Sequence, residues 1–306
     1  MTPRCWQLLW RASAFVVAAV VLAPIVIVVP MSFTASSTLT FPPEGLSLRW
    51  YQELLTNPDW TLRVPVSVET AFATAILATL LGTLAALGMT RGNFPGRGLL
   101  TALFLAPLVV PIIDLAVGDY FVWALGWQVG PLGFGGGLVG TVPGLVLAHT
   151  VLAVPFPFVT VSTALATVDR TLELAAAGLG ANPWRTFRRI TLPLISTGVL
   201  IGAVFAFLTS WDEVVVASFL ASPRVSTVPV QIFTELRQSY DPAAAAISTV
   251  LLAAALILVG MLALIPAFGR RAYGRSVTMN NQIASAETAA LTGVMSGSGG
   301  VAAPAN

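Results

Sequence analysis

Long apolar runs alternate with short polar segments along most of the chain, and this alternation predicts the main elements. The hydrocarbon core of a bilayer is about 30 Å thick, so a helix needs roughly 20 apolar residues to cross it. Runs that meet or approach this length lie at 12–31, 64–90, 98–125, 138–167, 192–220 and 246–268. We therefore predict an all-α polytopic membrane protein with about six transmembrane helices.

Composition agrees with a membrane protein and narrows its chemistry. Of the 306 residues, 56% are hydrophobic and 9% are charged, whereas a soluble globular domain has about 25% charged residues. All 15 basic residues are arginine, and without lysine the chain has neither a Walker A phosphate loop nor a Schiff-base residue. The single cysteine, Cys5, excludes an intrachain disulfide, and the single histidine, His149, lacks the partners of a usual zinc site. We expect no catalytic residue, no metal site and no enzyme activity in this chain.

Arginine placement predicts the orientation in the membrane. Short cytoplasmic loops are enriched in basic residues, and a cytoplasmic N-terminus places eleven of the fifteen arginines on that side, all except Arg49, Arg63, Arg224 and Arg237. An even number of spans then returns the C-terminus to the cytoplasm. The predicted divisions are an N-terminal transmembrane helix at 1–35, an external loop with an interfacial helix at 36–63, a core of five transmembrane helices at 64–268 that includes a cytoplasmic loop at 169–191, and a disordered cytoplasmic tail at 269–306.

Segments outside the apolar runs have distinct patterns. Residues 48–55 mix aromatic and leucine side chains with charges, which is typical of a short helix at a membrane surface, with a solvated loop as the alternative. Residues 130–140 are rich in glycine and uncharged, so we expect a flexible connection. After Arg275 the chain is rich in small residues and lacks the apolar surface that would offset the entropy of ordering.

The loop at 169–191 combines two helix-favouring segments with a break between them. Its first half is rich in alanine, Gly180 and Pro183 interrupt it, and its last residues favour a helix again. Trp184 and Phe187 are three residues apart and share one helical face, with arginines beside them. We predict that this knob docks into a groove of a soluble cytoplasmic partner. The alternative is that the arginines hold the loop at the anionic inner leaflet, at about 1 kcal/mol each.

The same loop carries a spaced motif. The pattern E-A-A, three residues, G, nine residues and I-x-L-P is matched at Ala175, Ala176, Gly180, Ile190, Leu192 and Pro193. On these residues the chain resembles the permease subunits of binding-protein-dependent ABC importers. Leu174 stands at the first motif position, and Glu173 precedes it. The resemblance implies a type I ABC importer permease fold with a coupling helix that inserts into the ATPase subunit, and it assigns coupling to Glu173, Ala175, Ala176, Gly180, Trp184, Arg185, Ile190, Leu192 and Pro193.

Two further stretches narrow the resemblance. FPPEGLSLRWY, and TSWDEVVVASFL followed by TVPVQIF, are similar to the spermidine/putrescine permease branch and its second subunit type. The resemblance implies four kinds of partner in the bacterial inner membrane system: a homologous permease subunit, two copies of an ATPase that binds ATP and magnesium, an extracytoplasmic solute-binding protein, and the bilayer. We expect a polyamine as the solute, with no cofactor or nucleic acid on this chain. Importers of ferric iron, sulfate, molybdate or amino-acid-like compounds share the motif, so these solutes stay open.

Five acidic residues fall at membrane depth, where a carboxylate costs several kcal/mol and is usually paired or functional. They are Glu69, Asp114, Asp119, Asp212 and Glu213. Counting about 1.5 Å per helical residue places all of them in the external half of the bilayer. Carboxylates pair with the ammonium groups of a polyamine, and Trp211 offers a cation–π face, so we predict that these residues line the substrate pathway. The alternative is that the acids contact water, cap a neighbouring helix or pair with an arginine.

Two other functional classes stay open. An ion-coupled carrier or channel would use the same acids, although such carriers often have repeated halves and no repeat is evident here. A membrane-embedded enzyme lacks the motifs H-E-x-x-H and G-x-S-x-G. We predict a permease subunit that forms half of a solute path and is powered by ATP bound elsewhere.

Overall fold

The computed structural model describes residues 3–129, 132–134, 136–238 and 241–261. The tail expected at 269–306 lies outside the described residues. One compact unit runs to Ile257, and the few described residues after it continue its last helix. The elements in chain order are α1 (Pro3–Met31), α2 (Arg49–Thr56), α3 (Pro58–Thr61), α4 (Arg63–Arg91), α5 (Arg97–Leu105), η1 (Ala106–Leu108), α6 (Ile112–Leu125), β1 (Trp127–Val129), β2 (Leu132–Phe134), α7 (Val142–Ala153), α8 (Pro155–Thr167), α9 (Arg170–Gly178), α10 (Pro183–Thr186), η2 (Phe187–Thr191), α11 (Leu192–Trp211), α12 (Val215–Leu220), α13 (Val228–Gln238) and the helix Pro242–Met261.

One short hairpin is the exception to a helical fold among the described residues. β1 and β2 pair antiparallel, with Trp127 opposite Phe134 and Val129 opposite Leu132. The sequence predicts only a flexible connection at 130–140, and the hairpin corrects this at its beginning. Backbone hydrogen bonds, which sequence composition does not reveal, order the two short strands.

The helix lengths agree with the predicted spans once two bends are taken into account. Among the described residues, four helices are long and apolar enough to cross a membrane, and up to six spans result if each bent pair counts as one. The segments Arg97–Leu108 and Ile112–Leu125 meet at 103°, and α7 and α8 meet at 43°. Proline explains both breaks, because Pro111 precedes α6 and Pro155 begins α8, and proline lacks the N–H that continues a helix. The run at 98–125 is therefore not one straight helix.

The run at 192–220 is also interrupted. α11 ends at Trp211, and α12 begins at Val215. Asp212 and Glu213 therefore lie in a break between two helices, where backbone groups and side chains can face a cavity. This differs from the single helix that the apolar run predicts.

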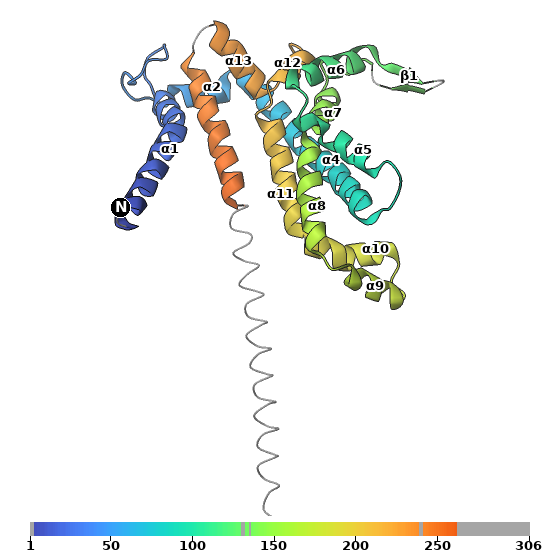
Figure 1. Ribbon diagram of the computed structural model, residues 1–306. Coiled ribbons are helices and arrows are strands. Elements are labelled where there is room, and N and C mark those ends of the chain that lie inside the picture. Colours follow the sequence, from blue (N-terminus) through green and yellow to red (C-terminus); the bar gives the residue numbers. More distant parts are fainter. Residues whose placement is uncertain (1–2, 130–131, 135, 239–240, 262–306) are drawn as a thin grey trace, which may run out of the picture. The chain divides into compact units, whose positions relative to one another are not determined.

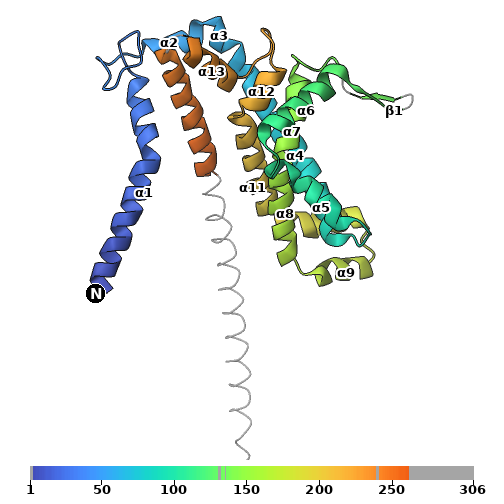
Figure 2. The same cartoon turned by 45° about the horizontal axis from the view of Figure 1, so that its top comes forward.

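Helices α4, α8 and α11 form the centre of the fold and lie side by side in Figures 1 and 2. Their close approach depends on glycines. A Cβ on Gly82 would lie 2.7 Å from Pro157 Cγ, one on Gly202 would lie 2.5 Å from Pro157 Cα, and one on Gly198 would lie 2.8 Å from the Thr160 carbonyl oxygen. α9 and α10 lie at one end of these three helices, and α6 and α12 lie at the other end (Figures 1 and 2).

Helix α2 is the short amphipathic helix predicted at 48–55, but protein covers part of its apolar face. Trp50 and Leu54 are buried in a cluster with Trp60 and Val228. The Trp50 Nε1–H donates a hydrogen bond to the carbonyl oxygen of Thr34 at 2.9 Å. These two side chains therefore belong to the protein core, and the position of α2 at the membrane surface stays a prediction.

Candidate coupling loop and solute pocket

Local sequence signals set both ends of the first helix in the loop at 169–191, which we call the docking loop after its predicted role. The Asp169 side chain accepts a hydrogen bond from the Thr171 backbone N–H at 2.9 Å and caps α9. This hydrogen bond stabilises the charged carboxylate and lowers the pKa of Asp169 below its usual value. At the other end, Gly180 has φ +84°, and the N–H groups of Gly180 and Ala181 donate to the carbonyls of Ala177 and Ala176 at 3.0 Å each. These paired bonds form a Schellman motif, which requires the left-handed backbone that glycine adopts without strain.

The second half of the loop presents an exposed aromatic face. Asn182 caps α10 by accepting a hydrogen bond from the Arg185 N–H at 2.8 Å, and the rings of Trp184 and Phe187 lie 5.8 Å apart. Trp184 is 67% exposed and Leu179 is 90% exposed. The predicted knob of two short helices with a sharp turn is therefore present, with large apolar side chains on its surface.

The remaining motif residues are distributed along the loop and into the next helix. Ala175 is exposed and Ala176 is half-buried on α9, and Arg185 is exposed on α10. Ile190 lies in the π-helical turn η2, and Leu192 and Pro193 begin α11. The turn η2 is continuous with α11, so the second half of the loop, from Pro183 onward, forms one continuous helical segment with this membrane helix. The coupling roles of these residues stay predictions.

Glu173 is bonded within the chain. The Arg91 Nη2–H donates to Glu173 Oε1 at 3.2 Å, and Arg91 Nε lies 3.2 Å from Glu173 Oε2. The Thr191 hydroxyl donates to Glu173 Oε1 at 3.0 Å. No local signal in the sequence selects Arg91 or Thr191, because they lie 82 and 18 residues from Glu173. The available signal was a charged residue near each of two helix ends, Arg91 at the end of α4 and Glu173 at the start of α9. This signal does not show that the two side chains pair.

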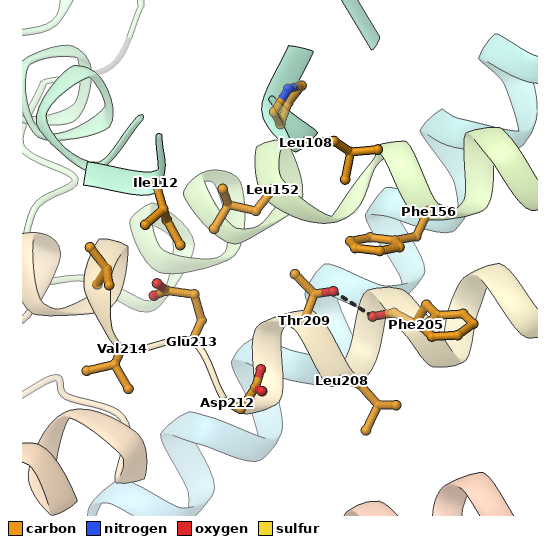
Figure 3. A pocket seen from close by; sticks show the side chains of 12 residues that line it. Leu108, Ile112, Leu152, Phe156, Phe205, Leu208, Thr209, Asp212, Glu213 and Val214 are labelled. Carbon is orange, nitrogen blue, oxygen red and sulfur yellow. Dashed lines mark hydrogen bonds between the residues drawn. The ribbon is translucent and has the colours of Figure 1, made fainter. Parts of the chain in front are cut away.

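A pocket of about 620 Å³ lies beside the break between α11 and α12. Its walls are mainly apolar, and they include the rings of Phe156 and Phe205, which stack on each other with centroids 6.0 Å apart. Figure 3 shows Asp212 and Glu213 on the chain segment that leaves α11, with the Glu213 carboxylate directed toward Ile112 and Leu152. Asp212 is exposed, whereas Glu213 is 5% exposed.

Hydrogen bonds fix Glu213 in place. Its Oε1 accepts from the Val216 N–H at 2.8 Å and its Oε2 accepts from the Ala217 N–H at 2.7 Å, so Glu213 caps α12. His149 Nε2 lies 3.5 Å from Glu213 Oε2, and His149 Nδ1 lies 2.7 Å from the Ser210 hydroxyl oxygen. This fits the alternative that an acid caps a neighbouring helix, and it leaves Asp212 as the accessible acid of the pocket.

The other predicted pathway residues are not among the side chains that line this pocket. Asp114 and Glu69 are exposed, and Asp119 is half-buried on α6. The Trp211 Nε1–H donates to the carbonyl oxygen of Leu251 at 3.4 Å, and its ring stacks on Phe207, so its indole has partners within the fold. Of the six predicted residues, the structure brings Asp212 and Glu213 together in a cavity.

Similar proteins identify the family. The family described as "Binding-protein-dependent transport system inner membrane component" matches residues 78–271. The chain belongs to this family. It is 35% identical over 238 residues to the putrescine transport system permease protein PotI of Escherichia coli K12, a match that covers 76% of this chain and 81% of that protein.

Two other relatives have related names. The chain is 32% identical over 250 residues to the spermidine/putrescine transport system permease protein PotC of Haemophilus influenzae. This match covers 81% of this chain and 93% of PotC. The chain is also 30% identical over 251 residues to the sulfate transport system permease protein CysT of Escherichia coli K12. This match covers 78% of this chain and 88% of CysT. The prediction of an importer permease is confirmed, and this chain is a membrane component of that transport machinery.

A solved structure supports the same fold. A bacterial ABC transporter involved in the import of the polysaccharide alginate superposes with a TM-score of 0.66 at 15% identity, covering 88% of this chain and 96% of that chain. At this identity the likeness concerns the fold alone. It confirms the predicted ABC importer permease fold.

Proposed function

We propose that this chain is one of two membrane subunits of an ATP-driven polyamine importer and forms half of the solute path. The relatives PotI and PotC are named as putrescine and spermidine/putrescine permeases, and each is similar over at least three quarters of this chain. The described residues that line the pocket include two carboxylates and no basic side chain. A mainly apolar cleft with negative charge favours a cation that has a hydrocarbon body. This acidic pocket is the observation that carries the proposal.

The energy source and partners follow from the docking loop. A separate ATPase, present in two copies, binds ATP and magnesium and docks on α9 and α10, while this chain has no ATPase activity of its own. The exposed Leu179 and Trp184 support docking, because exposed apolar patches mark interaction sites. A homologous permease subunit and an extracytoplasmic solute-binding protein complete the assembly. The arginine distribution supports a cytoplasmic location for the loop and both termini.

The transport cycle then alternates the access of one shared path. Closure of the ATPase pair draws the docking loops together and opens the outer side to a loaded binding protein, and hydrolysis returns the path to its inward-facing state. Asp212 meets an ammonium group of the solute. At about 4 Å and an effective dielectric constant of about 20, this pair interacts by about 4 kcal/mol before the cost of desolvation.

Uptake of labelled putrescine and spermidine tests the proposal, in a host that lacks its own polyamine importers and expresses the complete system. We expect Asp212→Asn to raise KM for uptake about tenfold, since part of the ion-pair energy is lost. Glu44→Gln is the matched control, because Glu44 is an exposed acid that does not line the pocket. Absence of polyamine uptake in the wild type, or equal effects of the two substitutions, would overturn the proposal.

A sulfate importer is the second candidate, because CysT is 30% identical to this chain. A dianion would meet the carboxylates of Asp212 and Glu213, and like charges repel at this range. We expect excess sulfate to leave putrescine uptake unchanged and excess spermidine to compete with it. Uptake of labelled sulfate in the same cells would support the second candidate.

A further inference from the structure

The docking loop has three neighbouring membrane helices and is joined through the chain to two of them. α8 runs into α9 through residues 168–169, and η2 runs directly into α11. α4 has no such continuity with the loop, because it is separated from it by α5 to α8 in sequence. Any movement that passes between the loop and α4 must therefore use noncovalent contacts.

Arg91 and Glu173 supply a directional contact at this point. Arg91 lies in the last turn of α4, and its guanidinium group makes the two 3.2 Å approaches to the Glu173 carboxylate. The two side chains are 20% and 21% exposed, so the pair is partly shielded from water. Arg91 Nη2–H donates a hydrogen bond to Glu173 Oε1, whereas Arg91 Nε approaches Oε2 as an ion pair without a hydrogen bond. One charge-assisted hydrogen bond therefore sets the direction of this contact. Thr191, which is 3% exposed, holds the same carboxylate from η2.

Apolar packing around this pair is loose. No residue of the fully described helices α9 and α10 is buried. A cavity of about 420 Å³ lies between the loop and α4, lined by Leu87, Arg91, Glu173, Ala177, Phe187 and Thr191 among others. The polar cluster therefore spans a space that side chains do not fill, and the loop is not fixed to α4 by a packed core.

We propose that Arg91, Glu173 and Thr191 form a joint that transmits movement of the docking loop to α4 and α11, and that Glu173 is a positioning residue which acts within this chain. The proposal rests on the function proposed above, and it places the coupling role that the resemblance assigns to Glu173 in a contact within this chain. The contact surface for the ATPase is then formed by the exposed side chains of the loop, Leu174, Leu179 and Trp184.

Charge reversal tests the joint in the assembled complex. The variants are Arg91→Glu, Glu173→Arg and the two together, and Arg97→Glu is the control, because Arg97 is exposed at the start of α5 and has no ion pair within the described part of the chain. Three quantities are measured: the amount of ATPase that co-purifies, the rate of ATP hydrolysis, and the solute taken up per ATP hydrolysed. The amide exchange of α9 is measured on the same samples.

Each single reversal is expected to retain the ATPase and to lower uptake per ATP at least fivefold, with faster amide exchange in α9. The double reversal restores both the uptake per ATP and the slow amide exchange of α9, and Arg97→Glu changes neither of them. The proposal is wrong if the single variants lose the ATPase and the double variant does not regain it, since Glu173 would then contact the partner. It is also wrong if uptake per ATP and amide exchange stay at wild-type values.

Failure of the proposed function would look different. In that case the wild-type complex shows no solute-dependent ATP hydrolysis. Amide exchange in the single and double variants still decides whether Arg91 and Glu173 hold the loop, because this readout needs no transport. Restored protection in the double variant supports the joint, and unchanged protection in all variants overturns it.

Discussion

Replacement of Gly82 by alanine should destabilise the packing of α4 against α8. The added Cβ would lie 2.7 Å from Pro157 Cγ, 2.9 Å from the backbone nitrogen of Phe158 and 3.0 Å from the carbonyl oxygen of Val154. Two of these atoms are backbone and the third is in a rigid ring, so none can move alone. Overpacking of this kind costs about 1–3 kcal/mol, and alanine recovers about 0.5–1 kcal/mol of helix propensity. The expected net loss is about 1 kcal/mol, within a range of about 0–2.5 kcal/mol.

Gly88 in the same helix provides the matched control. A Cβ there meets nothing within 4 Å among the described residues, so Gly88→Ala should be neutral or stabilising by up to about 1 kcal/mol. Thermal unfolding of the two purified variants in one detergent compares them directly. We expect a lower unfolding midpoint for Gly82→Ala and an equal or higher one for Gly88→Ala. A Gly82→Ala protein that is as stable as the Gly88→Ala protein would show that α4 and α8 do not depend on the glycine for their close packing.

Three further substitutions test the loop and the buried cluster. Gly180→Ala should cost about 1–2 kcal/mol because an L residue is strained at φ +84°. We expect faster proteolysis at the loop than in the wild type, with a smaller increase in Gly180→Asn. Equal proteolysis rates in the wild type and Gly180→Ala would contradict this. The pKa of Asp169 is lowered in the folded protein, so its carboxylate cap stabilises α9 above the unfolded pKa of about 3.9. In that pH range we expect slower amide exchange in α9 of the wild type than in Asp169→Ala, and the difference should vanish as pH falls through the folded pKa. A difference that persists in acid would contradict the cap. Ser210→Ala removes the 2.7 Å partner of buried His149 and should cost about 1–3 kcal/mol in thermal unfolding, whereas an unchanged midpoint would exclude this role.

The helices and the docking loop could be predicted from local signals. Apolar length located the spans, and Gly180 with Pro183 located the turn between α9 and α10. Pro111 and Pro155 marked the two breaks, but one bend is 103° and the other is 43°. A proline removes a hydrogen bond in either case, whereas the angle depends on the helices that pack nearby, which a single sequence does not contain.

The candidate site was predicted less completely for the same reason. Membrane depth selected five acids, but depth does not determine which face of a helix an acid occupies. Asp114 and Asp119 are five residues apart, and at 3.6 residues per turn they do not share a helical face. Glu213 precedes a short apolar helix, and this was the signal that it could serve as a cap. The contact of Arg91 with Glu173 depends on the tertiary fold alone.

We propose that this permease moves polyamines at the expense of ATP, which is hydrolysed by a partner on the docking loop. The most direct measurement is putrescine uptake into proteoliposomes that contain the complex purified through a tag on this chain, with the binding protein added on one side and ATP on the other. We predict uptake that requires both additions and that stops when ATP is replaced by a non-hydrolysable analogue. Uptake that proceeds without ATP would contradict the claim and would indicate a carrier or channel.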